Sequence, residues 1–415
     1  MKRILGLSSI LVASVISQAV FAETELSGFV TAGATYGDFP EAPAGSPEIQ
    51  YYDGSFTDHT DMSSVSRLGI QISSQVNKQV SMTGQLLAKS YDGSERYNVK
   101  ADWAFVTYKP IKNTAIRVGK LKLTSYLISD YYEVGYAYPW VRPPQEVYST
   151  NPITAVEGID ALIRFNFGNS SLLIQPYAGS NHDTPTVQPQ ETMYDTATWA
   201  AMFVAMGFTV DQALLMALEQ PEPGTVNYIE FTTKKLGGIN IAFSNPYFTV
   251  RAGHFSTRVY QEDFGVDGDR GAYTSAGLTV DWKNVVVYAE TFKREVEGMA
   301  SMAFPNQKGN YFTLGYRFGP LLVHATHARL ASDDVSDETF MTPAGPQPSV
   351  ALEQESTGLG IRYELGSGAA FKLEVTETTP EMGTRGLLVS DPNDSGLEDP
   401  SKSVRLYSMA LDVIF

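Results

Sequence analysis

The charged side chains with the most suggestive chemistry lie in and just before one aromatic and proline-rich segment, residues 123–156. Proline fixes its own backbone dihedral and restricts the residue before it, so we expect a rigid loop here. Acids inside the loop and bases upstream of it can face each other across whatever space the loop enters. Opposite charges on two sides of a space create a transverse electric field, which orients dipolar solutes. An ordered loop packed on a soluble β-sandwich is the alternative. The charges are the acids Asp130, Glu133 and Glu146 and the bases Arg117, Lys120 and Lys122.

The N-terminus has the layout of a secretory signal peptide. Lys2 and Arg3 precede an apolar run over residues 4–16, and small residues with a Val-Phe-Ala triplet end at Ala22. The apolar run is too short for a membrane-spanning helix of about 20 residues. We therefore expect residues 1–22 to be removed and residues 23–415 to form one exported domain.

The composition excludes several classes of protein. The chain has no cysteine, which excludes a disulfide scaffold and thiol chemistry. It carries 46 acidic against 30 basic residues, which disfavours nucleic acid as a partner. An exported, acidic chain rich in tyrosine and glycine fits either a periplasmic enzyme or a barrel of the outer membrane. The periodicity of the sequence separates these two classes.

Apolar and polar residues alternate with period two along most of the chain, as in strands with one dry and one wet face. In one such run, Phe312, Leu314 and Tyr316 oppose Thr313 and Gly315. A half-buried soluble sheet shows the same alternation, but aromatic residues near the strand ends also fit the girdle of a membrane barrel. The predicted strands are residues 26–36, 67–72, 80–90, 99–109, 114–122, 157–167, 170–179, 236–244, 247–256, 273–282, 285–293, 310–318, 321–330, 356–365, 370–378 and 404–415.

The connections between these strands alternate in length. Tight turns alternate with long, mostly acidic loops, which places the turns at one end of an antiparallel meander and the long loops at the other. Outer-membrane barrels sort their connections in this way, whereas a soluble sandwich has no reason to do so. We therefore predict an all-β, antiparallel, up-and-down transmembrane barrel of about sixteen strands. The predicted turns are Asn77-Lys78, Lys109-Pro110, Gly168-Asn169, Asn245-Pro246, Lys283-Asn284, Gly319-Pro320 and Gly366-Ser367-Gly368.

The last strand ends on a C-terminal aromatic residue. Tyr407, Met409, Leu411 and Val413 lead to Phe415 on one face, which resembles the terminal signal that the barrel-assembly machinery recognises. With its signal peptide, sixteen strands and long third loop after the fifth strand, the chain resembles the Gram-negative outer-membrane general-diffusion porins, which are sixteen-stranded trimers. Residues 130–148, DYYEVGYAYPWVRPPQEVY, resemble the constriction loop of gammaproteobacterial porins.

This resemblance implies a function and a set of partners. The protein is expected to be an outer-membrane channel for passive diffusion of ions and small hydrophilic solutes, not an enzyme, and to need no cofactor. Its expected partners are outer-membrane lipid, lipopolysaccharide and further copies of the chain in a homotrimer. Its third loop is expected to fold into the barrel, where loop acids face wall bases. A channel selective for a carboxylate, an amino acid or an oligosaccharide is the alternative.

A barrel of about sixteen strands is too wide for wall side chains to fill, so an inward loop would set its narrowest width. Alternation turns several bases toward the lumen, and Arg117, Lys120 and Lys122 can all join them only if a bulge at Gly119 changes the face. In the alternative of a substrate-selective channel, aromatic residues of the loop would offer the solute a sliding surface. The lumen bases are Arg67, Arg164, Arg251, Arg317, Arg362 and Lys372, and the aromatic residues are Tyr131, Tyr132, Tyr136, Tyr138 and Trp140.

The fourth external loop, residues 180–225, contains two helix-like pieces. Residues 195–206 carry an aromatic stripe, and residues 209–220 carry a leucine stripe and open with Thr209 and Gln212 at capping-box spacing. A hairpin this apolar is expected to bury itself. Packing on its own barrel rim is the first expectation, and the pore mouth, a neighbouring subunit or an external partner are the alternatives.

Catalytic motifs are absent from the sequence. The five histidines are scattered, and no G-x-S-x-G elbow, H-E-x-x-H pair or phosphate-binding glycine loop occurs. A barrel hydrolase with paired acids and a histidine at the rim remains the third function hypothesis. The acidic stretches 263–269 and 391–399 offer oxygen ligands to Ca²⁺, or to divalent ions that bridge to lipopolysaccharide, but such runs are more often solvated loops, so no metal site is predicted.

Overall fold

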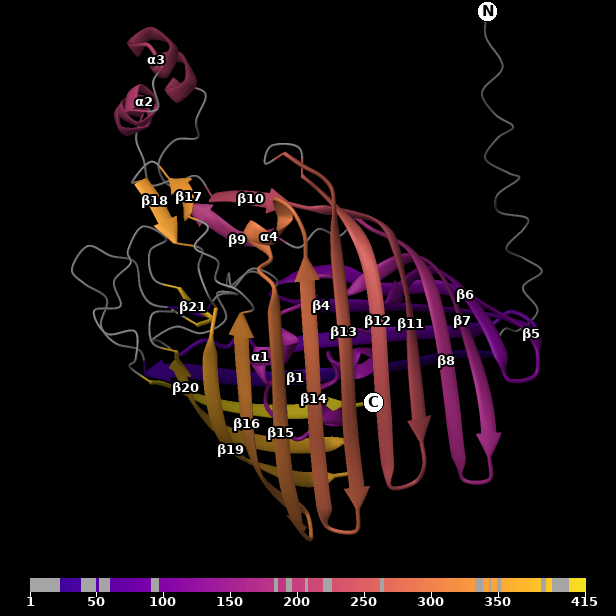
Figure 1. Ribbon diagram of the computed structural model, residues 1–415. Coiled ribbons are helices and arrows are strands. Elements are labelled where there is room, and N and C mark those ends of the chain that lie inside the picture. Colours follow the sequence, from indigo (N-terminus) through magenta and orange to yellow (C-terminus); the bar gives the residue numbers. More distant parts are fainter. Residues whose placement is uncertain are drawn as a thin grey trace, which may run out of the picture.

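The computed structural model describes residues 23–38, 50–51, 60–90, 97–182, 186–191, 196–205, 208–218, 226–261, 265–332, 339–342, 345–348, 352–381, 386–389 and 403–415. Within these residues, sixteen strands form one closed antiparallel barrel (Figure 1), which confirms the predicted fold class. The barrel strands are β1 (Glu23–Asp38), β3 (Arg67–Gln75), β4 (Val80–Lys89), β5 (Asn98–Ile111), β6 (Thr114–Lys122), β7 (Ala155–Phe167), β8 (Ser170–Asn181), β11 (Thr232–Ser244), β12 (Phe248–Gln261), β13 (Val266–Trp282), β14 (Val285–Val296), β15 (Gln307–Phe318), β16 (Leu321–Ser332), β19 (Gln354–Gly366), β20 (Ala369–Pro380) and β22 (Val404–Ile414).

The first and last strands close the barrel. β1 pairs with β3 on one side and with β22 on the other. The backbone N–H of Gly28 donates to the carbonyl of Phe415 at 2.8 Å, and the N–H of Phe415 donates to the carbonyl of Gly28 at 3.0 Å. The C-terminal aromatic residue therefore belongs to the seam, and closure removes the edges of the sheet.

The outward face of the barrel is apolar across its middle. Ile239, Ile241, Leu314 and Leu359 point outward and are between 41% and 60% exposed, as expected of side chains that contact lipid. Outward aromatic residues gather toward the short turns, where an interface girdle belongs. They include Phe165, Phe167, Trp282, Tyr316 and Phe318.

Short turns join the strands at one end of the barrel and long connections join them at the other (Figure 1). The predicted turns are confirmed with one exception. The turn between β5 and β6 lies at residues 112–113 and not at Lys109-Pro110, because Pro110 stays in β5 where the pairing with β6 shifts register. Proline cannot donate to a ladder, and such an irregularity tolerates it. Asn113 supplies the left-handed backbone of the turn, with φ of 64°.

Smaller elements lie at the loop end, outside the barrel sheet. Among the described residues, no helix is long and apolar enough to cross a membrane. The two-stranded sheets are β2 (Gln50–Tyr51) with β21 (Leu388–Val389), β9 (Thr186–Glu191) with β10 (Val226–Glu230), and β17 (Thr339–Thr342) with β18 (Gly345–Pro348); the helices are α2 (Thr196–Ala205), α3 (Val210–Leu218) and α4 (Ala300–Ala303).

The predicted helical hairpin forms as α2 and α3, which pack on each other beyond the barrel (Figure 1). The predicted capping box is present: the backbone N–H of Thr209 donates to Gln212 Oε1 at 3.1 Å, and the N–H of Gln212 donates to Thr209 Oγ1 at 3.4 Å. Within this chain the leucine stripe is exposed, so the first expectation, packing on its own barrel rim, is wrong, and burial against a neighbouring subunit or an external partner stays a prediction. Ala213 and Ala217 are buried instead, because small residues let the two helices approach closely. The exposed leucines are Leu214, Leu215 and Leu218, at 49%, 66% and 65%.

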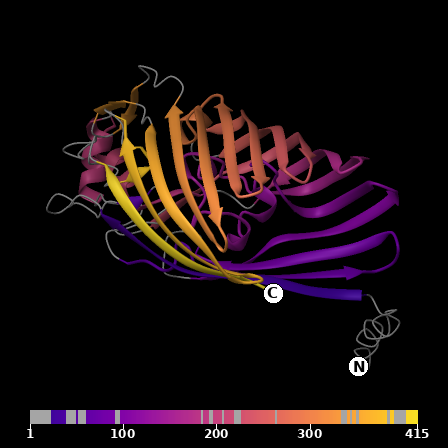
Figure 2. The same ribbon diagram turned by 90° about the horizontal axis from the view of Figure 1, so that it is seen from below.

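The long connection between β6 and β7 runs inside the barrel (Figure 2). It follows the fifth barrel strand, as predicted, and contains η2 (Ser129–Tyr131), η3 (Gly135–Ala137) and the one-turn helix α1 (Gln145–Tyr148). Its aromatic residues pack on inward side chains of β12 to β15, so the main core lies between this loop and the barrel wall. Core members are Tyr126, Tyr138, Trp140, Tyr148, Phe255, Tyr273, Phe292 and Tyr311.

Candidate functional site

Two wall arginines hold the inward loop, residues 123–154, by its backbone carbonyls. Arg251 on β12 donates to the carbonyl of Tyr126 at 3.1 Å. Arg362 on β19 donates to the carbonyl of Tyr138 at 2.9 Å. Hydrogen bonds from a charged donor are stronger than those between neutral groups. The two arginines therefore fix two separate parts of the loop to the wall.

Lys372 on β20 holds the middle of the loop. Its Nζ donates to the carbonyls of Gly135 and Trp140 at 2.6 and 2.7 Å, and it lies 2.9 Å from Asp412 on β22. Both charged side chains are 1% exposed, and Thr31 on β1 donates to Asp412 at 2.6 Å. A buried ion pair is costly unless its remaining hydrogen bonds are made. The two loop carbonyls make them for Lys372, and Thr31 makes one for Asp412 Oδ1, so the pair ties the loop to the seam of the barrel.

Glu290 on β14 holds the loop through the opposite kind of contact, as an acceptor. It accepts from the backbone N–H of Leu127 at 2.8 Å and from the Tyr148 hydroxyl at 2.6 Å. On the next strands, Trp140 Nε1 donates to Thr326 Oγ1 at 2.9 Å. Because wall groups from β12, β14, β16, β19 and β20 all contact it, the loop lies mainly against that half of the barrel. Arg67 on β3 and Lys89 on β4 reach it from the other half, through Glu133.

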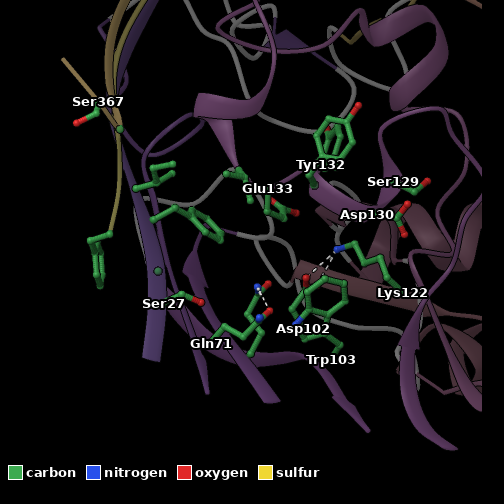
Figure 3. Close-up of a pocket in the computed structure, with 18 residues that line it drawn as sticks. Ser27, Gln71, Asp102, Trp103, Lys122, Ser129, Asp130, Tyr132, Glu133 and Ser367 are labelled. Atoms are coloured by element: carbon green, nitrogen blue, oxygen red, sulfur yellow. Dashed lines mark hydrogen bonds and ion pairs between the residues drawn. The ribbon is translucent and has the colours of Figure 1, made fainter. Parts of the chain in front are cut away.

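A cavity of about 590 Å³ lies between the loop and the other half of the wall (Figure 3). Loop residues 130–134 form one side of it. Gln71, Gln85 and Trp103 on β3, β4 and β5 form the other side, and the cavity reaches Ser367 at a short turn. This space is the candidate constriction, because the loop and the wall face each other across it.

The charged side chains along this cavity form ion pairs with one another or with neighbouring side chains. Lys122 Nζ lies 2.8 Å from Asp102 Oδ1 (Figure 3), and Glu133 lies 2.7 Å from Lys89 and 3.2 Å from Arg67. Burial acts to raise the pKa of Glu133, but Lys89 and Arg67 outweigh it and hold that pKa well below its usual range. Glu133 is therefore ionised at neutral pH.

The three predicted rim acids have different surroundings. Asp130 lines the cavity, pairs with Arg251, and has a side chain 44% exposed. Glu133 also lines the cavity but is largely covered by its two bases. Glu146 is 2% exposed and accepts from Gln354 Nε2 at 2.6 Å, and burial raises its pKa above the usual range. The structure places Glu146 behind the loop and not at a rim, since α1 turns its side chain toward the wall.

The predicted bases are only partly brought together. Lys120 lies on the outward face, beside Val118 (55% exposed) and opposite Glu157 in register, so Gly119 does not turn it inward. Arg164 lies beside the β5–β6 turn, where its backbone N–H donates to Asn113 at 2.9 Å. The bases that contact the loop are Arg67, Arg251, Arg362 and Lys372, while Arg117 pairs with Asp160, Lys122 with Asp102 and Arg317 with Asp281.

The predicted aromatic surface faces the cavity only in part. Tyr131 and Tyr132 line it. Tyr138 and Trp140 are each 1% exposed and belong to the core, where burial raises the pKa of Tyr138 above its usual range. Tyr136 packs under the guanidinium of a wall arginine. Of the five predicted loop aromatic residues, two tyrosines therefore line the cavity.

The acidic residues of the barrel wall that contact the loop or line the cavity were not predicted from sequence. Asp102 sits where the pairing of β4 with β5 shifts register, and this irregularity breaks the alternation that would have turned it outward. Glu290 and Asp412 did carry a signal, because each is an acid on the wet face of a predicted strand. Of the two acidic stretches, 391–399 lies outside the described residues, and in the other Asp269 accepts from the N–H of Ala300 at 2.9 Å. The described residues contain no metal-binding group of three or more side chains.

Comparisons with known proteins agree with this architecture. A family model described as Gram-negative porin matches residues 8–381. Salmonella typhi OmpF in complex with daunomycin aligns with a TM-score of 0.54 and 12% identity, over 94% of this chain and 97% of that one. The anion-selective porin from Comamonas acidovorans aligns with a TM-score of 0.54 and 12% identity, over 95% of this chain and 100% of that one. The outer membrane channel DcaP of Acinetobacter baumannii aligns with a TM-score of 0.50 and 12% identity, over 95% of this chain and 97% of that one. These identities support the fold alone, and no curated protein matches the chain.

Proposed function

This chain belongs to the Gram-negative porin family, and from that premise we propose that small hydrophilic solutes and ions cross it passively through the cavity beside residues 130–134. It is an outer-membrane channel by family and by fold. One observation carries the proposal: the inward loop is held mainly against one half of the wall and leaves a cavity, lined in part by charged side chains, beside the other half. Porin membership also favours a channel over the barrel-hydrolase alternative.

We infer that the charge selectivity of this channel is weak. Each charge along the cavity has a partner of opposite sign in direct contact, so the field of each pair falls off steeply with distance. Salt screens what remains over about 8 Å at physiological ionic strength. The acids are Asp102, Asp130 and Glu133, and their partner bases are Lys122, Arg251, Arg67 and Lys89.

Single-channel recording in planar bilayers tests both statements. We expect an ohmic conductance that follows the conductivity of the bulk salt, with a permeability ratio of K⁺ to Cl⁻ near one. The variant Lys122→Gln removes the base that neutralises Asp102, so it is expected to shift the ratio toward cations. Lys78→Gln, in a short turn, is the matched control. Strong rectification in the wild type, or an identical shift in both variants, would contradict the proposal.

A substrate-selective channel is the second candidate, and Tyr131 and Tyr132 favour it. Their rings line the cavity beside Asp130 and Lys122, so an aromatic surface lies close to charges of both signs. An amino acid suits this arrangement, and a carboxylate or an oligosaccharide fits parts of it. Block of the current by one such solute at low concentration, relieved in a Tyr131→Ala and Tyr132→Ala double variant, would select this function.

The assembly of the protein is also a proposal. We propose that residues 1–22, which lie outside the described residues, direct export, and that residues 23–415 form the mature chain. The barrel-assembly machinery would recognise Phe415, and three copies would associate among outer-membrane lipid and lipopolysaccharide. The support is the family itself. Light scattering of detergent-solubilised protein, corrected for bound detergent, should give three times the mass of one chain, and a monomer mass would remove the trimer.

A further inference from the structure

An aromatic side chain of the barrel wall, Trp103 on β5, faces the loop tyrosines across the candidate constriction. Trp103, Tyr131 and Tyr132 all line the cavity of about 590 Å³. Figure 3 shows Trp103 and Tyr132 on opposite sides of this space. The cavity therefore has an aromatic surface on its wall side as well as on its loop side.

Neighbouring side chains hold both aromatic surfaces in fixed positions. The Phe105 ring meets the Trp103 ring edge to face, with centroids 6.2 Å apart, and the Arg117 guanidinium lies 5.0 Å from the Phe105 centroid. On the loop, Tyr132 stacks on Tyr148, with centroids 5.6 Å apart and an interplanar angle of 16°. Rings that are fixed before a solute arrives lose little conformational entropy when it binds. Both surfaces are thus prepared to contact a flat, apolar part of a solute.

The indole N–H of Trp103 does not explain why a tryptophan stands here. Buried indole N–H groups usually donate a hydrogen bond, as Trp140 Nε1 does to Thr326 Oγ1 at 2.9 Å. Trp103 Nε1 is buried and has no hydrogen-bond partner among the described residues. The part of Trp103 that can act is therefore its ring, at the cavity.

Charged groups of both signs border the two aromatic surfaces. Lys122 Nζ donates to Asp102 Oδ1 and Oδ2 at 2.8 and 2.9 Å, and because an ammonium group carries three N–H donors, one remains for a solute carboxylate. On the loop, the Asp130 side chain is 44% exposed and can accept from a solute ammonium. Since each of these charges already has a partner, a net charge on the solute gains little here. A ring that contacts both aromatic surfaces gains more.

We propose that the cavity selects aromatic amino acids, with the solute ring between Trp103 and the two loop tyrosines, its ammonium at Asp130 and its carboxylate at Lys122. Aromatic pairs prefer offset-stacked or edge-to-face arrangements with centroids about 4.5–7 Å apart, and cavities of this size hold small-molecule ligands. This inference rests on the proposed passage of solutes through the cavity, and it names the solute class of the substrate-selective candidate. Trp103 is the residue that determines the selection.

Single-channel block by free amino acids tests this selection. L-Phenylalanine, L-leucine and glycine are added in turn to the wild-type chain in planar bilayers, and the concentration that halves the mean current is measured. We expect phenylalanine to block at the lowest concentration. Trp103→Leu should raise this concentration for phenylalanine about three- to tenfold and leave it unchanged for glycine, while Trp103→Phe should stay close to the wild type. Trp282→Leu, which replaces an outward tryptophan that is 50% exposed, is the matched control.

The two charges of the solute are tested by omission. N-Acetylphenylalanine lacks the ammonium and phenethylamine lacks the carboxylate, so each should block more weakly than phenylalanine. Equal block by all three would overturn the roles of Asp130 and Lys122.

Three results would overturn the selection itself: equal block by phenylalanine and leucine, equal block of the wild type and Trp103→Leu, or an equal loss of block in Trp282→Leu. The conductance in salt alone, recorded before each addition, reports on the proposed channel. Block by another solute that is relieved in the Tyr131→Ala and Tyr132→Ala double variant reports on the substrate-selective candidate. Failure of this inference is therefore distinguishable from failure of either proposed function.

Discussion

Neutralising the acids beside the cavity should expose the charge of the bases that they pair with. Asp130→Asn combined with Glu133→Gln removes two acids and leaves three wall bases in place. We expect a several-fold shift of the permeability ratio toward anions, and some loss of thermal stability because Arg67 is mostly buried and charged. Reversal potentials in a salt gradient measure the shift, with Glu377→Gln on the outward face as the control. Unchanged reversal potentials would remove both acids from the constriction.

The ion pairs of Glu133 also set its response to pH. Burial acts to raise the pKa of Glu133, and Lys89 and Arg67 outweigh it, so the pKa lies below its usual range. An acid with a lowered pKa stabilises the folded state above its ordinary pKa of about 4.3, and this contribution is lost as the pH falls through the lower folded value. Selectivity and thermal stability from this residue should therefore stay constant from pH 7 to about 5. An inflection within that range that disappears in Glu133→Gln would contradict the pairing.

At the scale of the element, the position of the inward loop depends on the close approach of the Gly135 backbone to the seam of the barrel wall. A Cβ there would lie 2.1 Å from Asp412 Oδ1 and 2.7 Å from Thr31 Oγ1, so Gly135→Ala should push η3 away from the seam. Overpacking of this kind costs about 1–3 kcal/mol, and a displaced loop should make the conductance larger and noisier while the barrel stays closed. Gly84→Ala is the matched control, because no described atom lies within 4 Å of a Cβ there. Equal single-channel records for the two variants would show that the loop does not depend on this contact.

The strands could be predicted from sequence because alternation depends on neighbouring residues alone, whereas the loop contacts could not, because they join residues far apart in the chain. Alternation is a local property, so β15 could be predicted from Phe312, Leu314 and Tyr316 without knowing its neighbours. Glu146 lies in a loop, where alternation does not apply, and its carboxyl contacts a strand more than two hundred residues later. The prediction for the leucine stripe of α3 was wrong for a different reason. An apolar stripe indicates burial but does not say which face of the helix a partner helix will cover.

At the scale of the whole molecule, barrel closure depends on the backbone, whereas delivery to the membrane would depend on a side chain. Gly28 and Phe415 exchange two backbone hydrogen bonds, at 2.8 and 3.0 Å, and any residue other than proline at position 415 can make both. The Phe415 side chain is 62% exposed, so its ring buries little of its surface in the barrel and is accessible to an assembly factor.

We therefore expect Phe415→Ala to refold in detergent with unchanged conductance and thermal midpoint, yet to reach the outer membrane in a several-fold smaller amount. Quantifying folded barrel in isolated outer membranes, beside refolding of the same variant from urea, measures both halves of this prediction. Phe318→Ala is the control, because that residue is an outward aromatic at the short-turn end with 60% exposure. If refolding in detergent fell as much as the amount in the membrane, the ring would be serving the stability of the barrel, and recognition by an assembly factor would have no support.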